Sequence, residues 1–269
     1  MNTQVVDRAD ASGGAGRSIT LTPITGTFGA YVHGCDLSKP ISESVAGELC
    51  DALRSYKVLA FDPQPNVEPP QLLAFGKLFG EPETEHPIWK NVEGSPGVMK
   101  LTANHLPVIT DSWHTDGSTR TSTKAVTILQ AADVPEYGRD TIFADMEAAF
   151  DNLSEPVQHF LEGLTALHSW GEQRPGSEPV EHPVVMVDPV SGRKTLYVNR
   201  MYTKKIVGLR ADESDALLRF LFDQAHFGEH QLRISWKPGQ IAMWDNSKTQ
   251  HYLVRDRAYP RVMHRVLAL

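Results

Sequence analysis

Cysteines and long apolar runs are scarce in this chain. Of its 269 residues only two are cysteines, Cys35 and Cys50, which is too few for a disulfide framework and favours a reducing compartment. No stretch approaches the roughly 20 apolar residues of a membrane span, and the first seventeen residues lack the apolar core of a signal peptide. These absences predict a cytoplasmic protein with no membrane partner.

Basic charge is also in deficit. The 33 acidic side chains outnumber the 26 basic ones and give a formal net charge of -7. This balance argues against nucleic acid as a partner, because its phosphates attract cationic proteins. The sequence contains no repeat and no block of like charge. With 41% hydrophobic and 22% charged residues, the composition is that of a globular protein.

Small and polar residues at the N-terminus predict a disordered tail over residues 1–17, followed by a single catalytic domain over residues 18–269. Within that domain, the spacing of apolar residues and the presence of capping residues predict a small number of helices. These are expected at Ser42–Ser55, Pro69–Phe79, Met146–Asn152, Glu155–Glu162 and Glu213–Gln224.

Short apolar runs separated by glycine and proline turns predict more strands than helices. The strands are expected at Lys57–Phe61, Ala125–Gln130, Thr141–Ala144, Thr195–Asn199, Leu232–Trp236, Ile241–Trp244 and Arg261–Leu269. The turn at Lys237–Gln240 predicts a β-hairpin between the two strands that flank it. The overall pattern favours a mainly β protein with flanking helices, built as a sandwich or jelly roll.

A His-x-Asp pair stands at His114 and Asp116. Side chains two residues apart on an extended segment point to the same face and can hold one metal ion. A third ligand from a distant strand would complete a face of two imidazoles and one carboxylate, which is typical of non-haem Fe(II) oxygenases. The pair alone is a weak signal, because chance gives roughly one such pair in a chain of this composition.

The C-terminal segment supplies three further candidates, His251, Arg261 and Arg265. If residues 261–269 form a strand, the two arginines lie on the same face. Buried guanidiniums need anionic partners, which an acidic cosubstrate and an acidic substrate would provide. From the spacing alone, a solvent-exposed pair on the last strand is an equal alternative.

Taken in order along the chain, these motifs resemble those of one family. The WHTD segment at 113–116, GRDT at 138–141, WDN at 244–246, TQH at 249–251 and the Arg261–Arg265 spacing are similar to the taurine/2,4-dichlorophenoxyacetate dioxygenase family. The resemblance extends from Ile19 to Leu269. It implies a double-stranded β-helix, a cupin-like jelly roll, that uses Fe(II), with 2-oxoglutarate and O2 as cosubstrates.

The resemblance also implies a role for individual residues. The implied iron ligands are His114, Asp116 and His251, and the 2-oxoglutarate carboxylate is expected at Thr141 and Arg261. The positions implied to face the substrate are His86, Trp89, Thr110, Trp170, Tyr202 and Arg265. His86 and Arg265 are retained from taurine dioxygenase, whereas the other four differ. This combination favours a sulfonate other than taurine, a sulfate ester, or a carboxylate such as an aryloxyalkanoate.

The expected reaction is hydroxylation of a small anionic compound, with oxidative cleavage where the hydroxylated carbon bears a sulfonate, sulfate or aryloxy group. The resemblance further implies a homo-oligomer, either a dimer or a tetramer. Two other functions use the same residues. A zinc-dependent hydrolase could hold its ion on the same triad, although Thr141 and the arginines then have no evident use. A non-catalytic organic-acid-binding β-barrel would not need the metal ligands.

Overall fold

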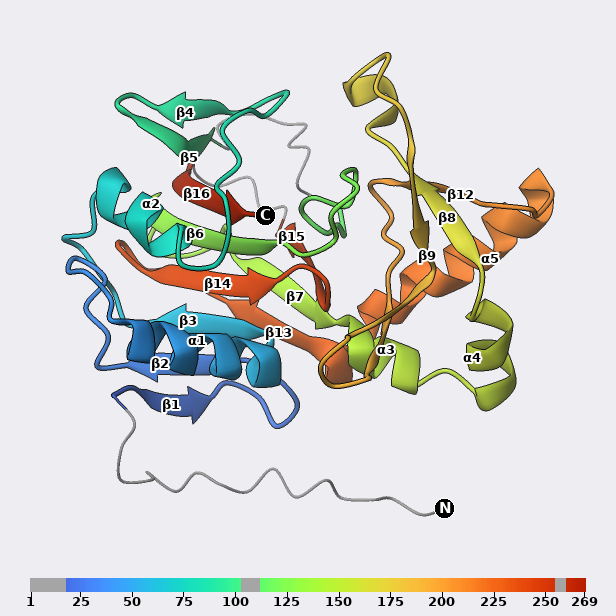
Figure 1. Ribbon diagram of the computed structural model, residues 1–269, viewed down its shortest axis with the longest axis horizontal. Coiled ribbons are helices and arrows are strands. Elements are labelled where there is room, and N and C mark those ends of the chain that lie inside the picture. The colour runs from blue at the N-terminus through green and yellow to red at the C-terminus, as the bar shows by residue number, and fades with distance from the viewer. Residues whose placement is uncertain (1–17, 103–111, 255–259) are drawn as a thin grey trace.

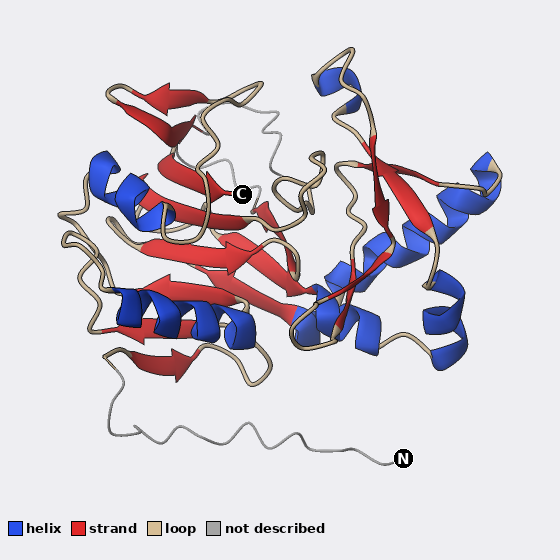
Figure 2. Ribbon diagram, in the orientation of Figure 1, coloured by secondary structure: helices blue, strands red, loops and turns tan. Residues whose placement is uncertain are grey.

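Two β-sheets packed face to face form the centre of the molecule, with helices outside them (Figure 1, Figure 2). The computed structural model describes residues 18–102, 112–254 and 260–269, so the tail predicted over residues 1–17 lies outside the described residues. The larger sheet runs in the order β1 (Thr20–Pro23), β2 (Ala30–His33), β3 (Val58–Phe61), β14 (Ile241–Asp245), β6 (Val126–Asp133), β16 (Val262–Ala268), β5 (Ser95–Thr102) and β4 (Lys90–Val92). The smaller sheet runs in the order β13 (Gln231–Ile234), β7 (Thr141–Asp145) and β15 (Thr249–Leu253).

Alternation along the strands of the larger sheet supplies two separate cores. On β14, Ile241 and Met243 pack on one face of the sheet, whereas Ala242 and Trp244 pack on the other. Successive side chains of a strand point to opposite faces, so one strand can serve both cores. The core that contains Trp244 also contains Phe143 of the smaller sheet. The two sheets therefore enclose a shared apolar interior, as in a jelly roll.

Two helices, α1 (Glu43–Tyr56) and α2 (Pro69–Gly76), cover the outer face of the larger sheet. The Ser42 side chain caps α1 by accepting a hydrogen bond from the Val45 N–H at 3.3 Å, which satisfies one of the free donors of the first turn. The helix buries Leu49 and Leu53 against the sheet. Burial of an apolar face in this way supplies most of the stability of a short helix.

Residues 146–230, between β7 and β13, form a side lobe that extends to the right in Figure 1. It contains α3 (Met146–Asp151), α4 (Glu155–Leu161), α5 (Ala211–Asp223) and the 3₁₀ turns η1 (Gly171–Gln173), η2 (Gln224–His226) and η3 (Gly228–His230). Its strands are β8 (Thr165–His168), β9 (Val180–Pro183) and β12 (Thr203–Ile206) in one small sheet, with β10 (Val185–Val187) paired to β11 (Lys194–Leu196). In the described residues, no helix is long and apolar enough to cross a membrane.

The predicted mainly β fold with flanking helices is confirmed. Each predicted helix and each predicted strand is present, with ends within three residues of the expected ones. The hairpin expected around Lys237–Gln240 is wrong, because β13 pairs with β7 whereas β14 pairs with β3 and β6. A tight turn is present, with the Gln240 N–H donating to the Lys237 carbonyl at 2.9 Å. That turn carries the chain from the smaller sheet to the larger one instead of joining two neighbours of one sheet.

Candidate metal centre and substrate cavity

The structure brings His114, Asp116 and His251 together as a buried cluster of metal-ligating side chains. His251 lies on β15, and His114 forms an isolated β-bridge with it through a pair of backbone hydrogen bonds of 3.1 and 2.9 Å. Asp116 does not continue the extended segment but begins a turn, in which Gly117 has a φ of 78°. Glycine adopts this left-handed conformation without steric cost. The turn places the carboxylate beside both imidazoles.

The distances within this triad fit a single metal ion. Nε2 of His114 lies 3.8 Å from Oδ1 of Asp116, and Nε2 of His251 lies 3.9 Å from Oδ2 of Asp116. Two ligand atoms can share one ion if they are separated by no more than twice a metal–ligand bond, which is about 4.2 Å for nitrogen and oxygen ligands. Two imidazoles and one carboxylate on one side of an ion are the donor set of mononuclear iron oxygenases. The residues present therefore fit a ferrous ion.

Both imidazoles are held in the form that binds metals. Nδ1 of His114 donates to the Ser112 carbonyl at 2.8 Å, which leaves the lone pair on Nε2 facing Asp116. Burial lowers the pKa of His114, and burial together with the adjacent His114 places the pKa of His251 well below its usual range. Neutral imidazole is the ligand form of histidine, so no proton has to leave before a metal binds.

Asp116 is kept ionised in spite of its burial. Burial raises the pKa of a carboxyl group, but the Arg265 guanidinium, whose Nη1 lies 3.3 Å from Oδ1 of Asp116, lowers it, as do the two histidines. Thr127 contributes as well, because its hydroxyl donates to Oδ2 of Asp116 at 2.8 Å. The pKa of Asp116 consequently lies well below its usual range, and the group can act as an anionic ligand.

The Asn246 carboxamide orients Asp116 from behind. Its Oδ1 accepts a hydrogen bond from the Asp116 backbone N–H at 3.1 Å, and its Nδ2 donates to the Thr127 hydroxyl at 2.8 Å. The same Oδ1 accepts from Nε1 of Trp244 at 3.1 Å. The WDN segment therefore fixes the backbone of one ligand and the hydroxyl that binds its carboxylate. Groups of this kind set both the orientation and the affinity of a metal site.

Thr141 and Arg261, the residues expected at 2-oxoglutarate, are both buried. On β7, Thr141 lies two residues from Phe143, which pairs with His251 of β15. The side chains of Thr141 and His251 therefore lie on the same face of the sheet. The Thr141 hydroxyl accepts from Nε1 of Trp236 at 2.9 Å, which leaves its own proton for another acceptor. Arg261 donates from Nη1 to the Arg139 carbonyl at 2.7 Å, and its charge acts on His251. Both residues thus lie around the His251 side of the triad.

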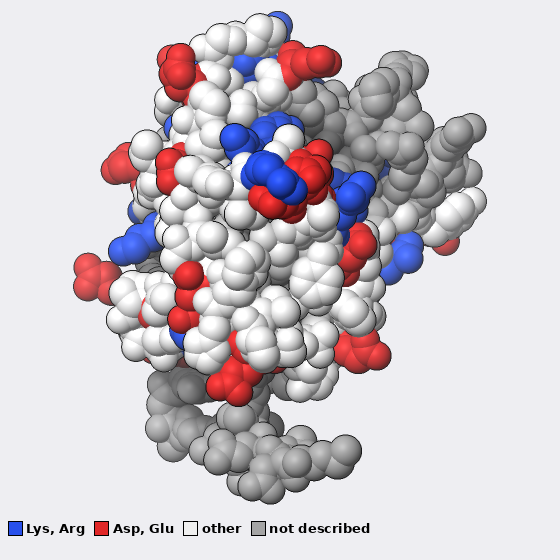
Figure 3. Space-filling view, turned by 90° about the vertical axis from the view of Figure 1, so that its right-hand side faces the viewer, with Lys and Arg blue, Asp and Glu red and all other residues white. Residues whose placement is uncertain are grey.

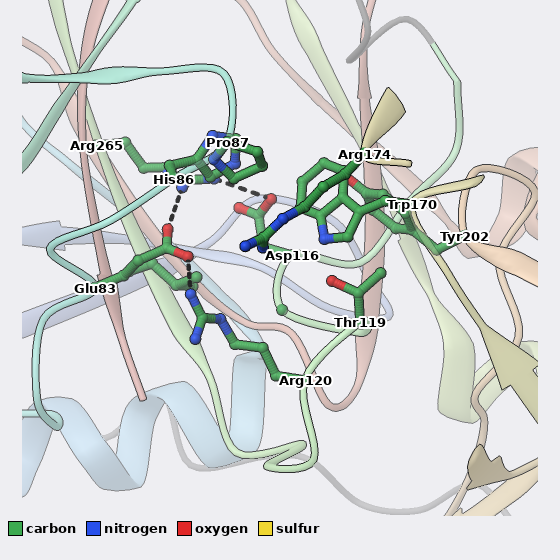
Figure 4. A pocket seen from close by; sticks show the side chains of 12 residues that line it. Glu83, His86, Pro87, Asp116, Thr119, Arg120, Trp170, Arg174, Tyr202 and Arg265 are labelled. Atoms are coloured by element: carbon green, nitrogen blue, oxygen red, sulfur yellow. Dashed lines mark hydrogen bonds and ion pairs between the residues drawn. The ribbon is translucent and has the colours of Figure 1, made fainter. Parts of the chain in front are cut away.

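A cavity of about 180 Å³ borders the triad at Asp116 (Figure 4). Four of the residues expected to face the substrate line this cavity: His86, Trp170, Tyr202 and Arg265. Trp89 is not among the lining residues, and it contributes instead a backbone N–H that donates to Nδ1 of His86 at 3.1 Å. Thr110 lies outside the described residues.

His86 presents a neutral ring to this cavity. Its Nδ1 accepts hydrogen bonds from the backbone N–H groups of Ile88 and Trp89 at 3.2 and 3.1 Å, so the proton of the neutral ring resides on Nε2. Burial, followed by the charge of Arg265, lowers the pKa of His86 to about 3. The ring packs edge-to-face on Trp170, with centroids 5.5 Å apart. His86 is therefore a neutral hydrogen-bond donor held in a fixed orientation.

Three charged residues of the cavity were not predicted from the sequence: Glu83, Arg120 and Arg174. Glu83 is buried and binds Arg265 and Arg120 at once, with 2.7 Å between its Oε2 and Nη2 of Arg265. Arg174 belongs to the loop between β8 and β9. None of the three stands in a recognisable motif. The one local signal is position, since Glu83 is three residues before His86 and Arg174 is four residues after Trp170.

Comparison with known proteins agrees with this geometry. The chain is 31% identical over 260 residues to an alkylsulfatase of Acinetobacter baylyi, covering 89% of this chain and 81% of that protein. It is 31% identical over 265 residues to an alpha-ketoglutarate-dependent sulfate ester dioxygenase of Pseudomonas putida, covering 91% and 87%. The solved structure of a taurine dioxygenase from Burkholderia xenovorans matches with a TM-score of 0.83 and 32% identity, covering 94% of this chain and 89% of that one.

The family whose members are described as taurine catabolism dioxygenases matches residues 20–267, nearly the whole of the chain. The match spans the triad, the cavity and both sheets, and it confirms the resemblance and the double-stranded β-helix expected from the sequence. This protein belongs to the TauD/TfdA family of dioxygenases.

Proposed function

We propose that this protein is an Fe(II)- and 2-oxoglutarate-dependent dioxygenase that hydroxylates a small anionic organic compound. The observation that carries the proposal is the buried triad of His114, Asp116 and His251, with neutral imidazoles and an ionised carboxylate. Three protein ligands on one side of an ion leave room for a cosubstrate and oxygen. A zinc hydrolase or a binding barrel is disfavoured, because the named relatives include a dioxygenase that depends on alpha-ketoglutarate.

Arg261 and Thr141 are the residues we propose to hold the distal carboxylate of 2-oxoglutarate. A guanidinium offers two parallel N–H donors that match the two oxygens of a carboxylate. The Thr141 hydroxyl, whose oxygen already accepts from Trp236, has its proton free to donate to the same group. The resulting contacts would fix the cosubstrate on the His251 side of the triad, away from the cavity at Asp116.

The small size of the cavity supports a small substrate. At about 180 Å³ it lies below the roughly 300–1,000 Å³ of sites for drug-sized ligands. Its guanidiniums and the Nε2–H of His86 suit an oxyanion such as a sulfonate, a sulfate ester or a carboxylate. The relative from Pseudomonas putida is named for sulfate esters. Oxidative cleavage would follow where the hydroxylated carbon carries a sulfonate, sulfate or aryloxy group, which leaves as the new hydroxyl becomes a carbonyl.

In this mechanism the chain contributes position and charge. Bound ferrous iron, with 2-oxoglutarate and O2, supplies the oxidising chemistry that inserts oxygen into a C–H bond. Asp116 and the two histidines hold the ion, and Arg265 keeps Asp116 ionised. Trp170 and Tyr202, whose ring centroids are 5.0 Å apart, form an apolar wall of the cavity that orients the carbon chain and excludes water. Correct placement of the reacting carbon is where the protein gains most of its rate.

Anaerobic addition of Fe(II) and 2-oxoglutarate tests the proposal. The expected results are a weak visible absorption band without oxygen and succinate formation with oxygen and an alkyl sulfate, an alkanesulfonate or an aryloxyalkanoate. Asp116→Asn should abolish both signals. Asp215→Asn, a matched change on the exposed face of α5, should preserve both. The absence of the band and of succinate in the unmodified protein would refute the proposed function.

We further propose that residues 18–269 form one catalytic domain of a cytoplasmic homo-oligomer, either a dimer or a tetramer. The free thiols of Cys35 and Cys50 support a reducing compartment. The exposed side chains of Phe160 and Phe220 in the side lobe support an interface between subunits, because large apolar groups at a surface favour association. Acidic and basic side chains are interspersed on the face seen in Figure 3, so the described part of this face carries no large patch of a single charge that would repel a second copy. Light scattering of the purified protein measures the oligomeric state.

A further inference from the structure

Glu83 forms an ion pair with Arg265, the arginine that the family resemblance assigns to the substrate. Its backbone N–H donates to the Leu267 carbonyl of β16 at 2.8 Å, which fixes Glu83 alongside the strand that carries Arg265. The Glu83 carboxylate then accepts from Nη2 of Arg265 at 2.7 Å, while its other oxygen accepts from Arg120. Glu83 and Arg265 are only 6% and 5% exposed. The chain therefore places a permanent internal anion where a substrate head group would approach.

Both terminal nitrogens of Arg265 already bind carboxylates of the chain. Nη2 binds Glu83, and Nη1 lies 3.3 Å from Asp116. The buried Nε has no hydrogen-bond partner in the described part of the chain. A substrate oxyanion that pairs with both Nη atoms of Arg265 would compete there with the buried carboxylates of Glu83 and Asp116, and the separation of a buried ion pair is unfavourable. Two of the five N–H groups of Arg265 are therefore committed, and the remaining N–H on each Nη belongs to a nitrogen that a buried carboxylate already holds.

Among the described residues, Arg174 has no carboxylate partner of this kind. The described residues provide it with no ion pair, and it lines both the cavity at Asp116 and the adjoining open groove of about 510 Å³. In Figure 4 its side chain extends past Trp170 toward the side of the cavity where Asp116 lies. The charge of Arg174 acts on His86, since it contributes to the lowered pKa of that ring. A guanidinium and the Nε2–H of His86 therefore adjoin the same space.

We propose that Arg174 is the residue that pairs with the anionic head group of the substrate, and that Glu83 imposes this arrangement by binding Arg265. The proposal rests on the proposed function, because it takes the cavity beside the triad as the substrate site. It assigns the specificity of this chain to the loop between β8 and β9. The ligand class is a singly charged oxyanion on a short carbon chain: Arg174 and His86 contact the oxyanion, and a remaining N–H of Arg265 contributes one further donor.

Binding of hexyl sulfate, pentanesulfonate and hexanoate tests the proposal. Each is titrated calorimetrically into the full chain with Fe(II) and 2-oxoglutarate under anaerobic conditions, and again without metal. Loss of a charge-assisted hydrogen bond should weaken oxyanion binding by Arg174→Gln about 10- to 100-fold. Arg174→Lys should recover part of that loss. Arg219→Gln, an exposed arginine on α5 outside the lining of either cavity, is the matched control and should bind like the unmodified protein.

Glu83→Gln distinguishes the two parts of the proposal. Removal of the internal carboxylate frees Arg265 for the head group, so the affinity for hexyl sulfate should rise. In the Glu83→Gln protein, adding Arg174→Gln should weaken hexyl sulfate binding less than threefold, because Arg265 then holds the head group. The effects of two residues that bind one ligand are not additive. If Arg174→Gln binds the oxyanions as tightly as Arg219→Gln, or if none of the oxyanions binds the unmodified protein, the proposal is overturned. The visible band of the iron and 2-oxoglutarate complex decides the proposed function separately.

Discussion

We expect the Asn246 carboxamide to control how firmly Asp116 holds a metal, and its removal to lower the metal affinity. Asn246→Ala deletes the acceptor of the Asp116 N–H at 3.1 Å and the donor to the Thr127 hydroxyl at 2.8 Å. All three metal ligands remain. Loss of an orienting group behind a ligand typically costs about 10- to 100-fold in metal affinity, which corresponds to roughly 1.4–2.8 kcal/mol. We expect a loss of affinity for Mn(II) in this range.

Titration of the protein with Mn(II), with the free ion followed by electron paramagnetic resonance, measures this affinity. Gln158→Ala is the matched control, because the Gln158 amide donates to the Phe150 and Leu153 carbonyls at 3.0 Å in the side lobe. Both variants should unfold more easily, but only Asn246→Ala should bind Mn(II) less tightly. Equal Mn(II) affinity in the two variants would show that the hydrogen bonds behind Asp116 do not set the metal affinity.

Three further predictions concern buried ionisable side chains. Arg261→Gln should raise the 2-oxoglutarate concentration for half-maximal succinate formation by about tenfold or more, with Mn(II) affinity unchanged. Lys57→Met leaves Asp145 and Glu147, which lie 2.6 and 2.8 Å from Nζ of Lys57, buried without that partner, and should lower the free energy of unfolding in urea by about 3–5 kcal/mol. Burial lowers the pKa of His168 to about 3, so the unfolded chain binds more protons there once the pH falls below about 6.5. The stability from this residue is complete above that pH and is lost on acidification, so His168→Gln should lose about 1 kcal/mol less than the unmodified protein between pH 7 and 5.5. A loss equal to that of the unmodified protein would contradict this assignment.

Local features of the fold are predictable from sequence because they depend on neighbouring residues. Ser42 identifies the start of α1, and the alternation around Met243 and Trp244 identifies a strand with two buried faces. The destination of the turn at Lys237–Gln240 is not predictable in this way. A tight turn looks alike whether it joins neighbours of one sheet or crosses between two sheets, and the pairing of β13 with β7 is decided by residues about 90 positions away.

The site likewise contains residues that a local motif identifies and residues whose role depends on distant parts of the chain. His114, Asp116 and His251 stand in short motifs, and their position on paired segments follows once those motifs are recognised. Glu83 acquires its role from the backbone bond to Leu267, which joins segments more than 180 residues apart. The partner of Arg265 was therefore beyond the reach of local pattern, and the spacing left burial and exposure of that arginine as equal alternatives. Burial required an anion, and the chain supplies one of its own.

The division between strands and loops also bears on how this scaffold can change its substrate over time. The triad is tied to β15 and to the turn after the His114 bridge, so a substitution there affects the metal itself. His86, Trp170 and Arg174 lie on connecting segments outside the strands. Replacements at these loop positions can alter which molecule is recognised while the oxidising centre stays intact. A combinatorial library confined to these three positions would sample new substrates without replacing a metal-ligating side chain.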